Sequence, residues 1–444
     1  MAKVVNILKT IRNNWKKSVF GSVLVFYGVN YGRNKYEISE LMREYCQEAV
    51  KYGEQPAPLG SKLRQIIVIL NPAANKRKAK ANFEKFCGPL LYLAGISVTV
   101  VQTESEGQAR GLVENLDQAV DAIVVAGGDG TVSEVVTGLL RRPDGNQAAQ
   151  RRFPVGILPL GQTNTVAGSL FAAADSNLVR TMADATMAVV REVTRPLDVV
   201  RVQALETEDG PPGKPVYCLG GVRWGAYRDA HARRDKYWYW DGLRAHVAYV
   251  FCGLKSGLSW HCEAGATYAR PCAGCSKCRG VGGDEAGGRV LEGRSRLWHA
   301  FLPWRSGTVN TRDELVDYSK VQNSECGMLH KKDISTVEFS LTTENVRPNC
   351  HRDGIPHMEM CLGPPTVSYT GFVSEGWRRV NGQEPQVAEK LQIREIVLRP
   401  VIPQDSSKDK ERWISIDNED YELKPIHVTL LPKKIHVFCT SNVA

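Results

Sequence analysis

A chain of 444 residues is long enough to form two domains, each with its own hydrophobic core. Its content of 43% hydrophobic and 24% charged residues is ordinary for a globular protein. The net charge of +9 suits binding to ATP and to an anionic membrane surface, whereas the lack of blocks rich in arginine and aromatic residues excludes a dedicated nucleic-acid-binding protein.

The N-terminus predicts a targeting segment that associates with a membrane. Residues 1–17 contain five basic residues and no acidic residue, and their apolar residues recur on one helical face, which resembles a mitochondrial targeting segment. Residues 18–32 are uncharged but shorter than the roughly 20 residues that span a bilayer, so we expect them to lie on the membrane or dip into it. The alternative is a buried first helix. We expect residues 1–60 to form this segment and a linker.

Residues 61–198 predict a nucleotide-binding α/β domain with a parallel sheet. Strand-like apolar runs recur about every 30 residues between helical patterns, which is typical of βαβ units. Ligands of such sheets bind where the strands end, so we expect a ligand site there. The expected strands are residues 66–70, 96–101, 122–126 and 155–158, and the expected helices are residues 75–93, 106–119, 131–140 and 163–190.

The string GGDGT at residues 127–131 directly follows the third expected strand. Glycines let the backbone turn sharply and approach a ligand, and a helix N-terminus attracts phosphate groups. Asp129 would be repelled by a phosphate unless it takes a proton or holds a metal ion. Thr131 and Glu134 have the spacing of a capping box. No lysine follows the glycines, which excludes a Walker-type loop, and the alternative is a tight turn with a solvated aspartate.

After residue 195, strand-like runs dominate and predict an antiparallel β-sandwich domain over residues 199–444. The expected strands are residues 199–202, 216–222, 335–341, 394–401, 413–416, 427–431 and 435–439, and residues 264–296 and 381–390 are expected to be loops.

Four of the 12 cysteines lie close together in the sequence, at Cys262, Cys272, Cys275 and Cys278. They are compatible with a zinc site, with disulfides, or with a flexible loop that carries free thiols. A strong zinc motif has two separated CxxC pairs, so the crowded spacing favours free thiols.

The order of four motifs resembles the diacylglycerol kinase catalytic domain, which diacylglycerol, sphingosine and ceramide kinases share. The motifs are NPAAN (71–75), TESEGQA (103–109), GGDGTVSEVVTGL (127–139) and LPLGQTNTVA (158–167). The N-terminus and the closing stretch of residues 414–439 resemble the mitochondrial acylglycerol kinases. The chain departs from the family pattern at Asn75, where a glycine is frequent, at Thr165, where many lipid kinases have aspartate, and at Asn418, which replaces the glycine of Asp-Gly-Glu.

The resemblance implies roles for individual residues. Either Asp129 or Glu419 takes the proton of the lipid hydroxyl, and we favour Asp129 because the glycine turn would hold it beside the γ-phosphate. Asp229 and Asp417 fall in the region of the lipid head group and the metal ion. The implied nucleotide-binding residues are Asn71, Asn75, Thr103, Gly127, Gly128, Gly130, Thr131, Glu134, Gly161, Thr163, Asn164 and Arg244.

The implied activity is transfer of the γ-phosphoryl group from Mg²⁺-ATP to monoacylglycerol and diacylglycerol, which forms lysophosphatidic acid and phosphatidic acid. The implied location is the mitochondrial inner membrane, facing the intermembrane space, with the carrier translocase subunits as partners. The alternatives are a kinase of ceramide or sphingosine, an NAD kinase, and a structural import subunit with little activity.

Overall fold

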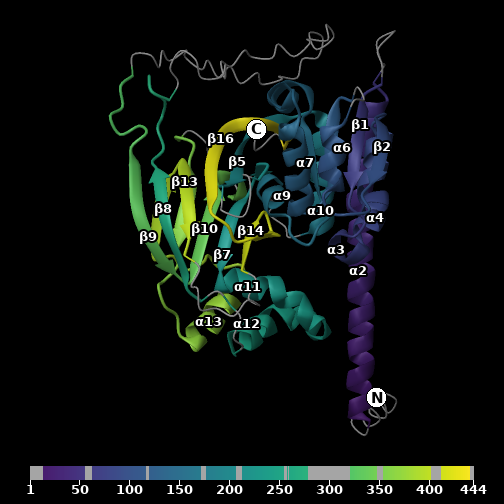
Figure 1. Ribbon diagram of the computed structural model, residues 1–444. Coiled ribbons are helices and arrows are strands. Elements are labelled where there is room, and N and C mark those ends of the chain that lie inside the picture. The colour runs from purple at the N-terminus through teal and green to yellow at the C-terminus, as the bar shows by residue number, and fades with distance from the viewer. Residues whose placement is uncertain are drawn as a thin grey trace, which may run out of the picture.

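Two β-sheets and the helices around them form the body of the protein, and one long helix extends beyond it (Figure 1). The computed structural model describes residues 14–55, 63–116, 120–171, 177–206, 213–254, 258, 260–278, 321–347, 354–401 and 412–440. The larger sheet has ten strands and the smaller has six.

The predicted parallel sheet is confirmed as one half of the larger sheet, in the order β2-β1-β3-β4. Its central strands are buried almost throughout, because helices cover both faces of a parallel sheet. The strands are β1 (Gln65–Leu70), β2 (Ser97–Gln102), β3 (Ala122–Gly127) and β4 (Val155–Pro159). The main helices are α6 (Gln108–Glu114), α7 (Asp129–Arg141), α9 (Thr165–Leu170) and α10 (Leu178–Arg191), with the short α8 (Gly145–Gln147) and a π-helical turn, Ala148–Arg152, after α7.

The helix expected over residues 75–93 is broken into short pieces. Asn75, Lys76 and Arg77 have left-handed φ values of 51°, 54° and 66°. Asparagine tolerates this conformation better than most residues, so a left-handed turn replaces the first helical turn. The pieces are α3 (Ala74–Arg77), α4 (Ala79–Asn82), a π-helical turn (Phe83–Cys87) and α5 (Gly88–Leu93).

The last strand, β16 (Ile426–Phe438), joins the parallel half to the antiparallel half of the same sheet. It pairs in parallel with β4 and antiparallel with β5 (Thr194–Ala204) and β13 (Glu395–Pro400). A bulge between Leu431 and Ile435 joins the two strands expected in this region into one. Ile435 and Val437 belong to the same buried core as the parallel strands, so the C-terminus completes the N-terminal fold.

The smaller sheet is entirely antiparallel and packs against the antiparallel half of the larger one, which confirms the predicted sandwich. The buried cluster between them includes Trp224, Phe339, Ile396 and Val428. In spatial order, its strands are β12 (Glu389–Ile393), β11 (Met358–Leu362), β10 (Glu338–Thr343), β7 (Gly221–Gly225), β14 (Trp413–Ile416) and β15 (Glu419–Glu422). The larger sheet adds β8 (Cys262–Ala269), β9 (Leu329–Thr336) and β6 (Val216–Cys218).

Two predicted loops are partly wrong. Strand β8 occupies the start of the segment expected to be a loop from residue 264, and β12 begins at Glu389 within the second expected loop. The sequence of β8, CEAGATYA, is rich in alanine and contains a glycine, residues that give little strand signal. Residues 279–296 of the first expected loop lie outside the described part of the chain.

A third buried cluster lies among helices at the base of the sandwich (Figure 1), and the sequence pattern did not predict it. Tyr227, Tyr249 and Phe372 pack together there. The helices are α11 (Ala226–Ala232), a 3₁₀ segment (Arg233–Leu243), α12 (Arg244–Leu254) and α13 (Tyr369–Val380), with a further 3₁₀ turn, Glu344–Val346, after β10.

Helix α2 (Trp15–Gly53) divides into a packed half and an exposed half. Its C-terminal half contacts α5 and α10, where Tyr45 Oη donates to Asp184 Oδ1 (2.6 Å) and Arg191 pairs with Glu48 (2.6 Å). Its N-terminal half stands away from the body (Figure 1) and exposes large apolar side chains, which contradicts the alternative of a buried first helix for this half. Within the described residues, no helix combines the length and apolar character needed to cross a bilayer. Most of the predicted basic segment with its apolar helical face, residues 1–13 of 1–17, lies outside the described residues.

Candidate active site

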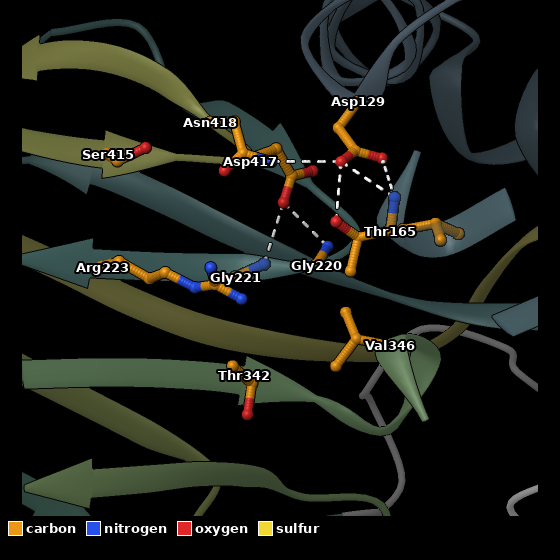
Figure 2. A pocket seen from close by; sticks show the side chains of 11 residues that line it. Asp129, Thr165, Gly220, Gly221, Arg223, Thr342, Val346, Ser415, Asp417 and Asn418 are labelled. Atoms are coloured by element: carbon orange, nitrogen blue, oxygen red, sulfur yellow. Dashed lines mark hydrogen bonds between the residues drawn. The ribbon is translucent and has the colours of Figure 1, made fainter. Parts of the chain in front are cut away.

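The carboxylate of Asp129 is the point where three segments of the chain meet (Figure 2). Asp129 is the first residue of α7 and is almost fully buried. It accepts hydrogen bonds from the backbone N–H of Thr165 (2.9 Å), from Thr165 Oγ1 (2.8 Å) and from Asn418 Nδ2 (3.1 Å). The loop after β3, the loop after β4 and the turn between β14 and β15 are thereby joined, as the expected convergence of motifs requires.

Asp417 and Asn418 form the two-residue turn of the β14–β15 hairpin. Both have positive φ values, 46° and 67°, as a type I′ turn demands, and Asp and Asn tolerate them well. The Asp417 carboxylate accepts backbone N–H groups from Leu219 (2.8 Å), Gly220 (2.8 Å) and Gly221 (2.9 Å). Burial, opposed by these N–H groups and reinforced by the Asp129 charge, raises the pKa of Asp417 to about 6. The turn is thus fixed to the start of β7.

Glu419 begins β15 and lies directly over the N-terminal turn of α7. A Cβ atom added to Gly130 would lie 2.5 Å from Glu419 Oε1, so this approach requires glycine. Tyr421 Oη donates to Glu419 Oε2 (3.1 Å). Burial and the nearby Glu134 charge raise the pKa of Glu419 to about 7, although the Tyr421 hydrogen bond opposes the shift. A carboxylate with a pKa near 7 is suited to proton transfer.

The glycines of the two central loops allow these loops to touch each other. A Cβ on Gly161 would lie 2.3 Å from Gly128 Cα, and a Cβ on Gly127 would lie 2.7 Å from Thr131 Oγ1. Asn164 braces the fourth loop, because its side chain accepts from Gly161 N (3.1 Å) and donates to Gly161 O (2.9 Å). The glycines are therefore required by contacts within the protein itself. The sequence had suggested a different reason, the close approach of a ligand.

The first and second loops are attached to α7. Asn71 Nδ2 donates to Thr131 Oγ1 (3.2 Å), and Asn71 Oδ1 accepts the backbone N–H of Ala73 (3.0 Å). The predicted capping box is wrong, because α7 begins at Asp129 and its N-cap is Gly128. Glu134 instead accepts the backbone N–H of Gly107 in the second loop (3.1 Å).

The remaining nucleotide residues lie at the same edge of the sheet. Thr103 is buried directly after β2, Asn75 begins the left-handed turn after β1, and the Thr163 carbonyl accepts the N–H of Asp129 (3.0 Å). The four loops expected to hold the nucleotide are therefore neighbours.

Arg244 and Asp229 are engaged in ion pairs among the helices at the base of the sandwich. Arg244 pairs with Asp235 (3.1 Å), and Asp229 pairs with the buried Arg228 (2.9 Å). Arg234 reaches the fourth loop instead, where it donates to Gln162 Oε1 (3.3 Å). The sequence pattern gave no signal for Arg234, because the contact joins residues that are far apart in the chain.

A small open pocket lies beside these carboxylates (Figure 2). It contains one arginine, Arg223, which the sequence analysis also missed. Carboxylate and hydroxyl oxygens are the ligands that Mg²⁺ prefers, so the donor set fits the implied magnesium ion. The pocket is lined by Asp129, Thr165, Val166, Gly220, Gly221, Arg223, Thr342, Val346, Ser415, Asp417 and Asn418.

Comparisons with known proteins identify the family of this chain. Residues 65–202 match the diacylglycerol kinase catalytic domain, and residues 313–444 match the acylglycerol kinase C-terminal region. The chain is 36% identical over 442 residues to "Acylglycerol kinase, mitochondrial" of Xenopus laevis, which covers 99% of this chain and 96% of the relative. The chain belongs to the acylglycerol kinase family.

Further relatives place this acylglycerol kinase family member among the lipid kinases. The human mitochondrial acylglycerol kinase is also 36% identical, over 97% of this chain and 96% of its own length. Human sphingosine kinase 1 is 32% identical over 177 residues, which are 39% of this chain and 44% of the relative. A structure titled as a putative diacylglycerol kinase from Bacillus anthracis str. Sterne shares the fold, with a TM-score of 0.50, 15% identity, and coverage of 86% of this chain and 100% of that chain. The protein is an ATP-dependent lipid kinase.

Replacing Gly130 with alanine should lower turnover while the fold is retained. The new Cβ would meet Glu419 Oε1 at 2.5 Å and Cγ at 2.9 Å, so the glutamate side chain must move away from α7. We expect kcat to fall about tenfold or more, with a smaller change in the KM for ATP, as for displacement of a group that acts in the transition state.

Gly168→Ala is the matched control, because a Cβ there meets no atom within 4 Å in the neighbouring helix α9. Steady-state kinetics and thermal unfolding of both variants check the result. Equal turnover in the two variants would show that the position of Glu419 does not matter.

Proposed function

We propose that this protein transfers the γ-phosphoryl group of ATP to the hydroxyl groups of monoacylglycerol and diacylglycerol, forming lysophosphatidic acid and phosphatidic acid. The names of the full-length relatives support these acceptors. The observation that carries the proposal is the Glu419 carboxylate, with a pKa near 7, placed against the N-terminal turn of α7 where phosphate groups bind most readily.

Glu419 is the better general base, although the sequence favoured Asp129. Asp129 already accepts hydrogen bonds from Thr165 and Asn418, which occupy both of its oxygens. Taking a substrate proton would require it to give up part of that network. Within the described part of the chain, Glu419 accepts one hydrogen bond, from Tyr421, and its other oxygen faces Gly130. The contacts therefore favour Glu419, and not Asp129, as the general base.

Asp129 and Asp417 would then hold the magnesium ion, since both carboxylates line the same pocket. Their hydrogen bonds are compatible with this role, because carboxylates that ligate a metal ion are commonly hydrogen-bonded as well. When bound, Mg²⁺ neutralises charge on the transferred phosphoryl group. The glycine loops place backbone N–H groups and the positive end of the α7 dipole toward the phosphates. Arg223 in the pocket and Arg234 beside the fourth loop supply positive charge.

During the transfer, the lipid oxygen bonds to the γ-phosphorus and the bond from that phosphorus to the ADP oxygen breaks. Glu419 accepts the hydroxyl proton, and ADP leaves with the electron pair of the broken bond. The residues of the four loops act chiefly by position and charge, because phosphoryl transfer needs little covalent participation from the protein.

Incorporation of radiolabelled phosphate from ATP into monoacylglycerol, diacylglycerol, ceramide and sphingosine tests the acceptor. We expect the two glycerolipids to be labelled far faster than the two sphingolipids at equal surface concentration in mixed micelles. Faster labelling of ceramide or sphingosine would replace the proposed acceptor with the alternative one.

Replacement of Glu419 and replacement of Asp129 should change different kinetic parameters. Glu419→Gln should lower kcat by about 10²-fold or more with nearly unchanged dependence on Mg²⁺-ATP, because only the base is lost. Asp129→Asn should chiefly weaken the apparent binding of Mg²⁺-ATP.

In the native protein, kcat should fall as the pH falls through about 7, because protonated Glu419 cannot accept a proton.

The pH profile of Glu419→Gln provides the control, since the kcat of this variant should no longer fall as the pH falls through about 7; this fall is the acidic limb of the profile. If Asp129→Asn instead removes turnover and the limb, while Glu419→Gln keeps both, Asp129 is the base.

We also propose that the N-terminal half of α2 attaches the protein to the mitochondrial inner membrane, on the side of the intermembrane space. The full-length relatives are named as mitochondrial. Phe20, Phe26 and other apolar side chains project from α2 without a protein partner in the described structure, and Phe26 is 75% exposed. Trp238, which is 72% exposed, and Trp240 are exposed on the 3₁₀ segment beside α12 and suit the same interface, where tryptophan is enriched.

Deleting residues 1–35 should release the protein from mitochondrial membranes. The contacts of Tyr45 and Glu48 with α10 remain, so the kinase body should stay folded. Alkaline extraction of fractionated mitochondria measures the result, with soluble activity as the check on folding. The variant Phe20→Glu/Phe26→Glu should show the same loss in a full-length chain, and membrane retention of both variants would reject the anchor.

As the family resemblance implies, we propose a second role as a subunit of the carrier translocase. Binding to a partner complex needs the folded surface but not the phosphoryl transfer. Asp129→Asn should therefore co-purify with translocase subunits at the native level, although its weakened binding of Mg²⁺-ATP lowers its kinase activity. Loss of co-purification by this folded variant would tie assembly to catalysis, and absence of co-purification by the native chain would reject the role.

A further inference from the structure

Four cysteine side chains gather where strands β8 and β9 leave the larger sheet. Each pair of sulphur atoms among Cys272, Cys275, Cys278 and Cys326 lies within 4.8 Å. The first three follow β8, and Cys326 precedes β9 on the other side of a long connection. Cys262, which the sequence grouping included, lies inside β8, where it is buried with its sulphur 3.9 Å from the carbonyl oxygen of Val337. The expected group of four was therefore wrong in one member.

The spacing of the sulphur atoms matches one shared metal ion. Four thiolates at about 2.3 Å around a tetrahedral zinc ion lie about 3.8 Å from one another. The Cys275–Cys278 and Cys272–Cys278 sulphur distances are 3.7 Å and 3.9 Å. A disulfide would hold two sulphurs at about 2.05 Å, and all four cysteines are free thiols here.

Hydrogen-bond donors surround the sulphurs as they do in metal-thiolate sites. The backbone N–H of Cys275 donates to Cys278 Sγ (3.3 Å), and the N–H groups of Lys277 and Cys278 donate to Cys275. The side-chain amide of Asn323 donates to Cys272 Sγ (3.3 Å). Such donors stabilise thiolate charge and orient the ligands around an ion.

The register of the β8–β9 pair brings the two halves of the cluster together. Ala269 pairs with Leu329 at the end of the ladder, and Cys272 and Cys326 each lie the same number of residues beyond that pair. The backbone N–H of Ser276 also donates to the carbonyl oxygen of Val321 (2.9 Å), which joins the two segments directly. The fold itself therefore places the fourth cysteine opposite the first three.

We propose that Cys272, Cys275, Cys278 and Cys326 bind one Zn²⁺ ion in a closed tetrahedral site. The ion would hold together the segment that leaves β8 and the segment that enters β9. Four soft thiolate ligands select zinc over magnesium. Four protein ligands leave no open position for a substrate, so the ion is structural. Strands β8 and β9 end the larger sheet at the edge opposite β2, far in strand order from the nucleotide loops (Figure 1).

Metal analysis of the full-length chain tests the site. The protein is purified in detergent without chelators or a histidine tag, and zinc is measured by inductively coupled plasma mass spectrometry. We expect about one zinc per chain in the native protein and well under half of that in Cys326→Ser. Cys361→Ser is the matched control, because this partly exposed cysteine lies in β11 outside the cluster, and it should retain the full zinc content.

A measurement on the native protein keeps the test independent of variant folding. X-ray absorption at the zinc edge should show four sulphur neighbours at about 2.3 Å. A native chain with no stoichiometric zinc, one that carries iron instead, or one whose four thiols resist alkylation as disulfides would overturn the proposal. So would zinc content that Cys326→Ser leaves unchanged. None of these results depends on the lipid that the kinase phosphorylates.

Discussion

The architecture of the site depends on one buried carboxylate. Asp129 is held by donors from Thr165 and Asn418, which lie far apart in the chain. A buried carboxylate without such donors is strongly unfavourable, so the fourth loop and the C-terminal hairpin are required for α7 to begin where it does. Thr165 stands where many related lipid kinases have aspartate. A threonine hydroxyl can donate to Asp129, whereas an ionised aspartate would repel it.

The glycines around Asp129 make this arrangement possible by removing side chains where backbones and carboxylates meet. Gly128 and Gly161 face each other from neighbouring loops, and Gly130 makes room for Glu419. Close packing at these points leaves little freedom for the loops to separate, so their N–H groups are already oriented before a nucleotide arrives. Such preorganisation is the main catalytic resource in phosphoryl transfer.

The sequence predicted the parallel sheet and the convergence of the four loops because these features have local signals. Buried runs of β-branched residues indicate β1 and β3, and the motifs that follow these runs indicate where the strands end. The sequence missed features that depend on distant pairing. Strand β8 has a single β-branched residue, a partly buried threonine, which gives little strand signal. Arg234 contacts Gln162 only in the folded chain, and Cys326 joins its cluster only through the β8–β9 register. The capping box failed because α7 starts earlier, on a glycine N-cap.

The C-terminal hairpin gives three nearby carboxylates three different environments. Asp417 lies in the turn and binds three backbone N–H groups, which fix the hairpin to the start of β7. Side chains alternate across a strand, so Glu419 and Tyr421 share the face toward α7 while Asp420 faces away and pairs with Arg228. The Arg228–Asp420 pair ties β15 to α11, where Arg228 also pairs with the neighbouring Asp229. Glu419 is thus left as the carboxylate of this hairpin that faces the N-terminal turn of α7, and the anchored residues on either side of it in the sequence hold it in place.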